Sequence, residues 1–358
     1  MSNGGQTGDW RGQLAITGLG LVSPVGLTAE AATAALRAGV SRLCRIESFE
    51  IEVDEGVYDA VIGAEVPRLT RGRLGPDRLF RMLQPAFAEV IQDARIKPET
   101  RLGVYLGTSG NRPAERKLDY GSATKQALLE SVPAGYTITH AKILPSGRAS
   151  VLQAVRTAAS AFEQNLIDLA IIGAADSWVT PRALSWLRAN GKLAEFPRRT
   201  GTMPGEAAGL IALESPQHAA QRGAHAYAYV CASAGRFETV KWGEPNNAIA
   251  LSQSIQSVAA GVNEPKAVVI SDLSGERYRA LEWVMAQSKA MWYYNTMVHW
   301  NPANCMGDTG AASGAVMLAW AAWALRKGYA GVKNILVWGA SDEGAREALL
   351  LNAADNTS

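Results

Sequence analysis

The sequence predicts an α/β protein made of two related halves, and two observations carry this prediction. The segment 147–176 recurs loosely as 310–342. Each copy begins Gly-x-Ala-Ser, continues at helical length, passes a polar break and closes as an apolar run with Gly-Ala-x-Asp, which is typical of a helix feeding a buried strand. Strand-like and helix-like patterns also alternate along the chain. Both repeat helices are apolar on nearly every side, so we expect them at the centre.

The first half contains elements that follow from local patterns. A short apolar run at 14–16 predicts the first strand. Thr28 is a preferred N-cap and Glu30 suits the first turn, so we expect a helix over 28–38. Residues 45–75 are irregular and predict short strands with a surface loop. Apolar spacing predicts the other elements of this half, which are helices at 76–94, 123–131 and 181–189 and strands at 102–107, 136–143 and 209–214.

A polar break at 215–223 predicts the boundary between the halves. The second half again alternates strands and helices before its copy of the repeat. Its expected elements are strands at 226–232 and 267–270, helices at 247–260 and 276–288, and an aromatic-rich segment at 291–300. The whole chain is therefore divided into a disordered start (1–12), a first half (13–222), a second half (223–351) and a tail (352–358).

Composition indicates an ordinary globular protein and excludes several kinds of partner. The net charge is +2 with the signs interspersed, so we expect no nucleic-acid partner. The longest apolar stretch, 311–325, is shorter than the roughly 20 residues of a membrane span. Three distant cysteines match neither a disulfide framework nor a metal site, and the pair Gly18 and Gly20 lacks the rest of a nucleotide fingerprint. We expect no metal, no cofactor and a cytoplasmic location.

Several segments occur in an order that resembles one enzyme family. They are 16–26 (ITGLGLVSPVG), the helix that starts near Asp77, the strand end 173–177 (GAADS), and 197–214, which ends in GEAAGLIALE. Over 14–351 the chain is thus similar to the β-ketoacyl-acyl-carrier-protein synthases, or ketosynthases. The resemblance implies a thiolase-like fold with duplicated α/β/α/β/α layered halves. It also implies a homodimer, or a heterodimer with a related subunit, joined through the strand before the central helix.

The resemblance also names three catalytic positions, and this chain differs from the family at each. A ketosynthase carries its cysteine at the N-terminus of the central helix, where the dipole favours a thiolate, but here the register falls on Arg148. The first family histidine is replaced by Asp272. The second is replaced by Gly307, with Asp308 beside it. The family's Cys-His-His triad is therefore predicted to be absent.

Two functions follow from this difference. The first is a non-catalytic binding or dimer-partner (scaffold) protein, as chain-length-factor subunits are beside active synthases. The alternative is an acyltransferase that acts on acyl thioesters through a rearranged site, in which a new nucleophile needs an adjacent base. The candidate groups for such a site are Ser146, Ser150, Cys305 and His299, with Asp272 and Asp308. The alternative is a purely structural role for these residues. In that case the serines are N-caps, and the aspartates are carboxylates stabilised at helix N-termini.

Two sets of arginines suggest specific contacts. Arg277 and Arg279 follow Asp272 in a polar loop, and loop-borne polar residues are often functional. A basic run could dock an acyl carrier protein, as basic surfaces of the family do, or form a solvated face. This run consists of Arg68, Arg71, Arg73, Arg78 and Arg81.

Overall fold

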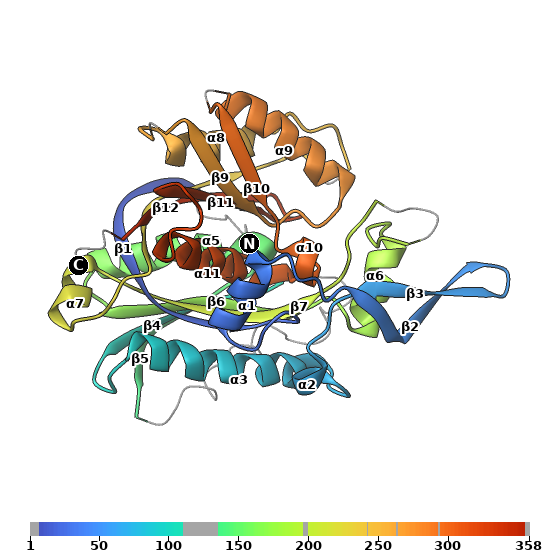
Figure 1. The fold of residues 1–358 in the computed structure, drawn as a ribbon, viewed down its shortest axis with the longest axis horizontal. Helices are drawn as coiled ribbons and strands as arrows, with labels where there is room; N and C mark the ends of the chain where they lie inside the picture. Colours follow the sequence, from blue (N-terminus) through green and yellow to red (C-terminus); the bar gives the residue numbers. More distant parts are fainter. Residues whose placement is uncertain are drawn as a thin grey trace.

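The computed structural model describes residues 7–109, 135–195, 200–241, 243–262, 264–292 and 294–354, without the side chains of 48 and 53. The helix expected at 123–131 lies outside the described residues. The described elements stack in five layers of helix, sheet, helix, sheet and helix (Figure 1). One buried apolar cluster surrounds the central helices, and one more lies under each outer helical layer.

Ten strands of the described chain are hydrogen-bonded in one continuous order, which divides into two equivalent blocks. The first block is β5 (Thr137–Leu144), β4 (Arg101–Gly107), β6 (Leu169–Ser177), β7 (Glu206–Glu214) and β1 (Gly8–Val22). The second is β10 (Thr296–Trp300), β9 (Lys266–Ser271), β11 (Asn334–Ala340), β12 (Ala345–Ala353) and β8 (Ala228–Phe237). In both blocks the first three strands are parallel and the last two pair antiparallel. The two halves thus share one topology.

The long strand β1 joins the two blocks. Its residues 8–16 pair antiparallel with β8, and its residues 15–22 pair antiparallel with β7. The register shifts twice along β1, and such bulges bend a strand. The expected disorder of 1–12 is therefore wrong for 8–12, because backbone pairing with a distant strand orders a segment whose one large apolar side chain, Trp10, packs against the central cluster.

The central layer consists of α5 (Ser150–Glu163) and α11 (Ser313–Arg326), which are the helices of the repeated segment. A short 3₁₀ turn precedes each helix and begins at a glycine with positive φ, +50° at Gly147 and +56° at Gly310. In α11, 12 of the 14 residues are buried. A Cβ on Gly314 would lie 2.8 Å from the Cβ of Val151, so small residues let the two helices approach closely.

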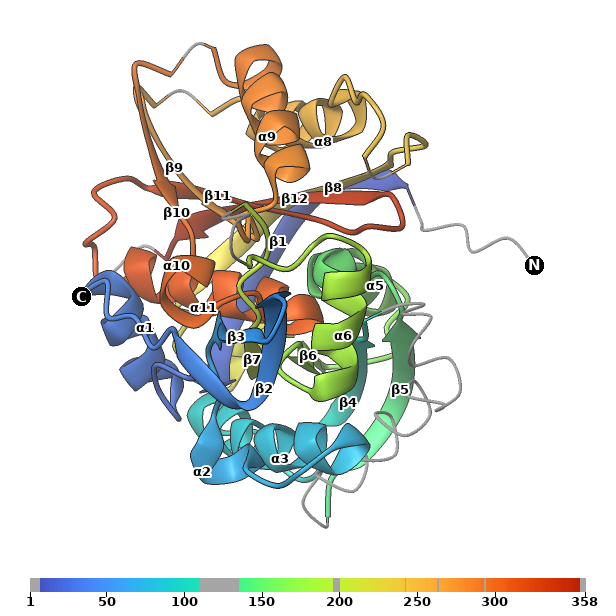
Figure 2. The ribbon, with the colours of Figure 1, turned by 90° about the vertical axis from the view of Figure 1, so that its right-hand side faces the viewer.

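The other helices cover the sheet or lie at its side. The outer layers are α3 (Gly75–Ala94) on the first block and α8 (Ile249–Ala259) with α9 (Arg277–Ala290) on the second (Figure 1). An antiparallel ribbon of β2 (Cys44–Asp54) and β3 (Val57–Gly63) lies beside α6 (Pro181–Ala189) at one side of the molecule (Figure 2). The remaining helices are α1 (Ala29–Arg37), α2 (Pro67–Thr70), α7 (Pro216–Gln221) and α10 (Ala303–Met306).

The predicted N-cap of the first helix agrees with the structure, whereas the predicted C-terminal tail begins too early. Thr28 caps α1, since its side chain accepts a hydrogen bond from the Ala31 N–H. Strand β12 was not predicted, and it extends into the expected tail as far as Ala353. The division at 215–223 falls on α7, between the last strand of the first half and β8. Among the described helices, none is both long and apolar enough to cross a membrane.

Candidate functional site

Arg148 lies at the point where the first central helix begins. The positive φ of Gly147 turns the chain there, and the Gly147 N–H donates to the Thr108 carbonyl at 3.0 Å. Arg148 and Ala149 complete the 3₁₀ turn before α5. The Arg148 side chain turns inward and is only 5% exposed, so its guanidinium needs buried partners.

Carboxylates from three other segments surround this guanidinium. Its Nε lies 3.1 and 2.9 Å from the two oxygens of Asp308, and its Nη2 donates to the same carboxylate. Its Nη1 lies 3.4 Å from Asp342 Oδ1, and Nη2 lies 3.7 Å from Glu276 Oε1. Trp178 stacks nearby, with its ring centroid 5.9 Å from the guanidinium carbon. The bidentate pair with Asp308 is the strongest geometry available to an arginine.

Two further cations complete the cluster. Lys192 Nζ lies 2.7 Å from Asp342 Oδ2 and 3.8 Å from Glu276 Oε1. Arg279 binds Asp272, whose second oxygen accepts the Ala340 N–H at 3.0 Å. We call this cluster the ion network, and its members are Arg148, Lys192, Arg279, Asp272, Glu276, Asp308 and Asp342.

The ion network holds its central pair in the charged state. Burial alone would raise the pKa of Asp308, but the charge and hydrogen bonds of Arg148 hold that pKa below its ordinary value. Burial works against the charge of Arg148 as well, yet Asp308, Asp342 and Glu276 together raise its pKa. A cation that is bound on several sides cannot act as a nucleophile, and Arg148 has no neutral form near neutral pH that could act as a base.

The three positions named by the motifs lie close together. Arg148 and Asp308 are in direct contact. A Cβ on Gly339 would lie 3.4 Å from both the Arg148 carbonyl oxygen and Asp272 Oδ2, so the second position borders the first. Gly307 has φ +69°, and a Cβ there would lie 2.6 Å from the Pro204 carbonyl oxygen. The fold therefore places Asp308, rather than a side chain at 307, against the guanidinium.

The candidate groups of a rearranged site are not arranged as nucleophile and base. Ser146 Oγ donates to Gln153 Oε1 at 2.7 Å. Ser150 is fully buried, and its Oγ has no hydrogen-bond partner among the described residues. Burial raises the pKa of the Cys305 thiol, which opposes thiolate formation. His299 Nε2 instead pairs with Ser271 Oγ, at 2.7 Å.

The cavity at this place is too small for an acyl chain. It has a volume of about 70 Å³ and is bordered by Arg148, Asp176, Trp178 and Asp342. Small-molecule sites have volumes of about 300–1,000 Å³. Within the described part of the chain, no group of three His, Cys, Asp or Glu side chains is placed to hold a metal ion.

Sequence analysis missed three of the seven members of the ion network. Lys192, Glu276 and Asp342 were not candidates, because they come from separate segments and pair across 84 to 194 positions of sequence. Arg279 was singled out only as a loop residue with specific contacts. One signal could have found Asp342, since it closes the second copy of the repeat where Asp176 closes the first.

His299 gives an expected pH dependence of stability. Burial against the Trp283 ring lowers its pKa to about 4, whereas an unfolded histidine has a pKa of about 6.5. As the pH falls from about 6.5 to 4, the unfolded chain takes up a proton that the folded chain does not, so this site makes the protein less stable, by at most about 3 kcal/mol.

We therefore expect His299→Gln to lose less stability than the wild type between these pH values. Urea unfolding at several pH values measures the difference, with the exposed His225→Gln as the matched control. Parallel stability curves for the wild type and His299→Gln would contradict the assignment.

Comparison with known proteins identifies the fold. No protein-family model and no curated protein matches the sequence. Among solved structures, a chain of the AntDE:AntF complex, in which a type II polyketide synthase acyl-carrier protein is bound to its ketosynthase, matches with a TM-score of 0.80 at 17% identity. This match covers 96% of our chain and 100% of the other.

Two further solved structures agree. The ishigamide ketosynthase/chain length factor matches with a TM-score of 0.76 at 19% identity, over 96% of this chain and 100% of that one. The ketosynthase from module 6 of the bacillaene synthase of Bacillus subtilis 168 matches with a TM-score of 0.75 at 15% identity, over 96% of this chain and 72% of that one. The chain therefore has the thiolase-like fold of the ketosynthases, as the motifs predicted.

Proposed function

We propose that this chain is a non-catalytic ketosynthase-like protein that acts as a binding or dimer partner of another subunit. One observation carries the proposal: a buried arginine occupies the start of the central helix, where a ketosynthase would carry its cysteine, and carboxylates saturate it. The small size of the cavity beside it supports the same conclusion. One structural neighbour is a ketosynthase/chain length factor, which makes a partner role reasonable for this fold.

The absence of covalent chemistry can be tested directly. We expect no acyl adduct on the intact protein, and no release of carbon dioxide, after incubation with acyl and malonyl thioesters of a carrier protein. An active ketosynthase in the same reagents is the positive control, and circular dichroism establishes that the tested protein is folded. A stoichiometric adduct or sustained decarboxylation would contradict the proposal and favour the acyltransferase alternative. Ser146→Ala, Ser150→Ala and Cys305→Ala would then identify the nucleophile.

A dimer through β5 is the second part of the proposal. This strand is the edge of the first block, and within the described chain only β4 pairs with it. Its side chains alternate between exposed and half-buried from Thr137 to His140, and its free edge can accept another strand. We expect a dimer by light scattering after size-exclusion chromatography, and Ile138→Pro, which removes a backbone donor, should weaken it. A wild-type protein that is monomeric, alone and with a related subunit, would exclude this part.

An acyl carrier protein is a further proposed partner, and only part of the basic run is exposed enough to contact it. Arg78 cannot take part, since its side chain is 6% exposed and bound to Glu206. Arg73 and Arg81 remain at the surface on either side of Asp77. Arg68 and Arg71 are exposed as well, so these four arginines are the part of the run that an acidic carrier protein could contact, as one neighbour of this fold is complexed with an acyl-carrier protein.

A further inference from the structure

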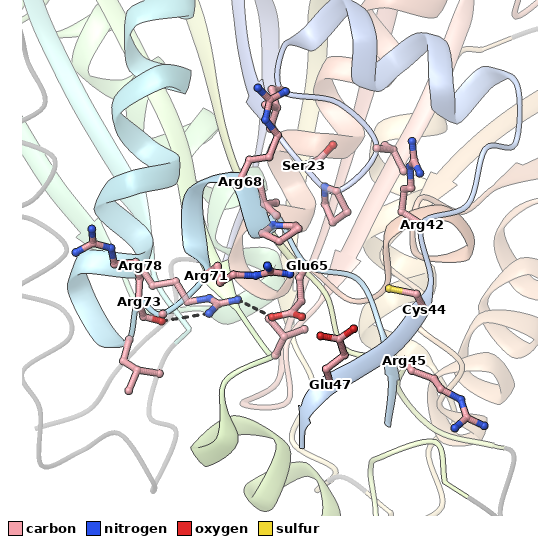
Figure 3. Close-up of a pocket in the computed structure, with 18 of the residues that line it drawn as sticks. Ser23, Arg42, Cys44, Arg45, Glu47, Glu65, Arg68, Arg71, Arg73 and Arg78 are labelled. Atoms are coloured by element: carbon pink, nitrogen blue, oxygen red, sulfur yellow. Dashed lines mark hydrogen bonds and ion pairs between the residues drawn. The ribbon is translucent and has the colours of Figure 1, made fainter. Parts of the chain in front are cut away.

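A large cavity lies between the loop from β1 to α1, strand β2 and the segment from α2 to α3 (Figure 3). Its volume of about 730 Å³ is in the range of small-molecule sites. Much of the lining is apolar and comes from Pro24, Val25, Leu27, Val66, Val179 and Pro181. None of these residues belongs to the ion network, so the cavity is a separate site.

Arginines dominate the polar part of this lining. Arg42, Arg45, Arg68 and Arg71 are exposed, and within the described residues none of them forms an ion pair. Figure 3 shows Arg42 and Arg68 on either side of the loop at Ser23. Four like charges around one opening repel one another and remain hydrated until an anion binds.

The carboxylates at this site do not balance these charges. Glu47 and Glu65 line the cavity, and Glu65 Oε1 already accepts from Arg78 Nη2 at 3.1 Å. Arg73 also lines the cavity, and it is paired with Asp77, which does not. Positive charge stays in excess even when the counter-ions of Arg73 and Arg78 are included.

The wall behind these arginines is held in place by buried bonds. Glu206 Oε1 accepts the Val66 N–H at 2.7 Å and the Thr70 hydroxyl at 2.8 Å, which fixes both ends of α2. Arg78 closes the same wall through its bonds to Glu206 and to the Thr70 carbonyl. A cavity whose wall is already ordered loses little entropy when a ligand binds.

We propose that this arginine-rimmed cavity binds a small amphiphilic anion, an alkyl or acyl chain with a phosphate or carboxylate head group. The chain lies against the apolar lining, where burial of its methylene groups drives binding. The head group accepts charge-assisted hydrogen bonds from arginines of the rim, which suit planar or tetrahedral oxyanions. This site goes beyond the partner role proposed above and does not depend on it.

Cys44 provides a direct probe of occupancy. It lines the cavity and is exposed, whereas Cys231 is half-buried and Cys305 is buried. A maleimide added to the folded protein should therefore modify Cys44 first, and peptide mapping by mass spectrometry follows this site alone. We expect dodecyl phosphate or dodecanoate, kept below its critical micelle concentration, to slow this reaction about tenfold or more. The half-protecting concentration is the amphiphile concentration that halves the rate of Cys44 modification. The head group with the lower half-protecting concentration is the one that the site prefers.

Charge reversal on the rim tests the role of the arginines. Arg68→Glu with Arg71→Glu should raise the half-protecting concentration at least about tenfold, because charge-assisted bonds are replaced by repulsion. Arg81→Glu with Arg277→Glu makes the same change of charge outside the cavity and should have no effect. All four arginines are exposed, so thermal unfolding should show that both double variants remain folded.

Three results would overturn the proposal. The first is absence of protection by both amphiphiles up to their solubility limits. The second is that the arginines do not recognise the charge of the head group. Equal protection by the neutral dodecyl maltoside would show this, and so would an unchanged half-protecting concentration in the rim variant. The third is equal protection by inorganic phosphate alone, which would show that the apolar lining contributes nothing.

Discussion

Arg148→Ala is expected to destabilise the protein by about 3–5 kcal/mol, because removing one partner of a buried ion pair leaves the other charge uncompensated. Three carboxylates share this guanidinium, and Asp308, whose side chain is 1% exposed, is the one that it contacts bidentately. Folded domains are stable by only about 5–15 kcal/mol, so the loss should be obvious in urea unfolding followed by circular dichroism.

Two controls separate this effect from a general loss of charge. Arg81→Ala removes an arginine that is 44% exposed and, among the described residues, pairs only with Asp77, so it should change stability by less than about 1 kcal/mol. Arg148→Met with Asp308→Asn removes both charges, while the amide oxygen can still accept the Gly310 N–H that Asp308 binds at 2.9 Å. This double variant should be more stable than Arg148→Met alone. Equal stability of the wild type and Arg148→Ala would contradict the ion network.

Glu206→Ala is the second substitution with a large expected effect, again about 3–5 kcal/mol. The Glu206 side chain is fully buried and accepts from Val66, Thr70, Ser177 and Arg78. Its bonds to Arg78 are bidentate, with Nε at 2.6 Å and Nη2 at 3.0 Å. Among the described residues, the variant leaves the buried guanidinium of Arg78 with Glu65 as its remaining carboxylate, and it removes the acceptor of the Val66 N–H.

Glu65→Ala is the matched control for Glu206→Ala. It removes a carboxylate from the same arginine, but the Glu65 side chain is 29% exposed and makes one contact of 3.1 Å. We expect this control to lose less than about 1 kcal/mol. Because Glu206 holds both ends of α2, Glu206→Ala should also weaken protection of Cys44 by an amphiphilic anion, whereas Glu65→Ala should not. If both variants lost the same stability, burial would not be the deciding factor.

The ion network also stabilises the junction of the two central helices, because Asp308 precedes the turn of one helix and Arg148 lies in the turn of the other. Charged side chains fill this junction and leave a cavity of only about 70 Å³ beside Arg148.

Sequence analysis recovered those parts of the fold that depend on local pattern. Apolar periodicity placed α3, α5 and α11, since one helical face, or nearly the whole helix, must be buried. The N-cap at Thr28 followed from its side-chain oxygen. The repeated segment revealed two equivalent halves because each copy codes for the same helix and strand. The position of Arg148 followed from motif register alone.

Elements that depend on distant partners could not be predicted from local pattern. Strand β12 contains Arg346 and Glu347, both buried, which a local pattern assigns to the surface. Arg346 binds Glu282 at 2.7 Å, and Glu347 binds Arg156 from α5. The first residues of β1 are ordered by pairing with β8, by the ion pair of Asp9 with Arg236 and by packing of Trp10 on the central cluster. In each case the stabilising group comes from another part of the chain.

The sequence by itself thus determined the fold class, the two halves, the central helices and the place of Arg148 at the start of the first one. Only the tertiary structure decided what surrounds Arg148, since Glu276 and Asp342 pair with it, and Lys192 with both of them, across much of the chain. It also decided that Arg78 is a buried structural group while its neighbours in the basic run rim a cavity. The physical reason is that apolar periodicity acts within one element, whereas charge pairing and cavity shape arise only when elements pack together.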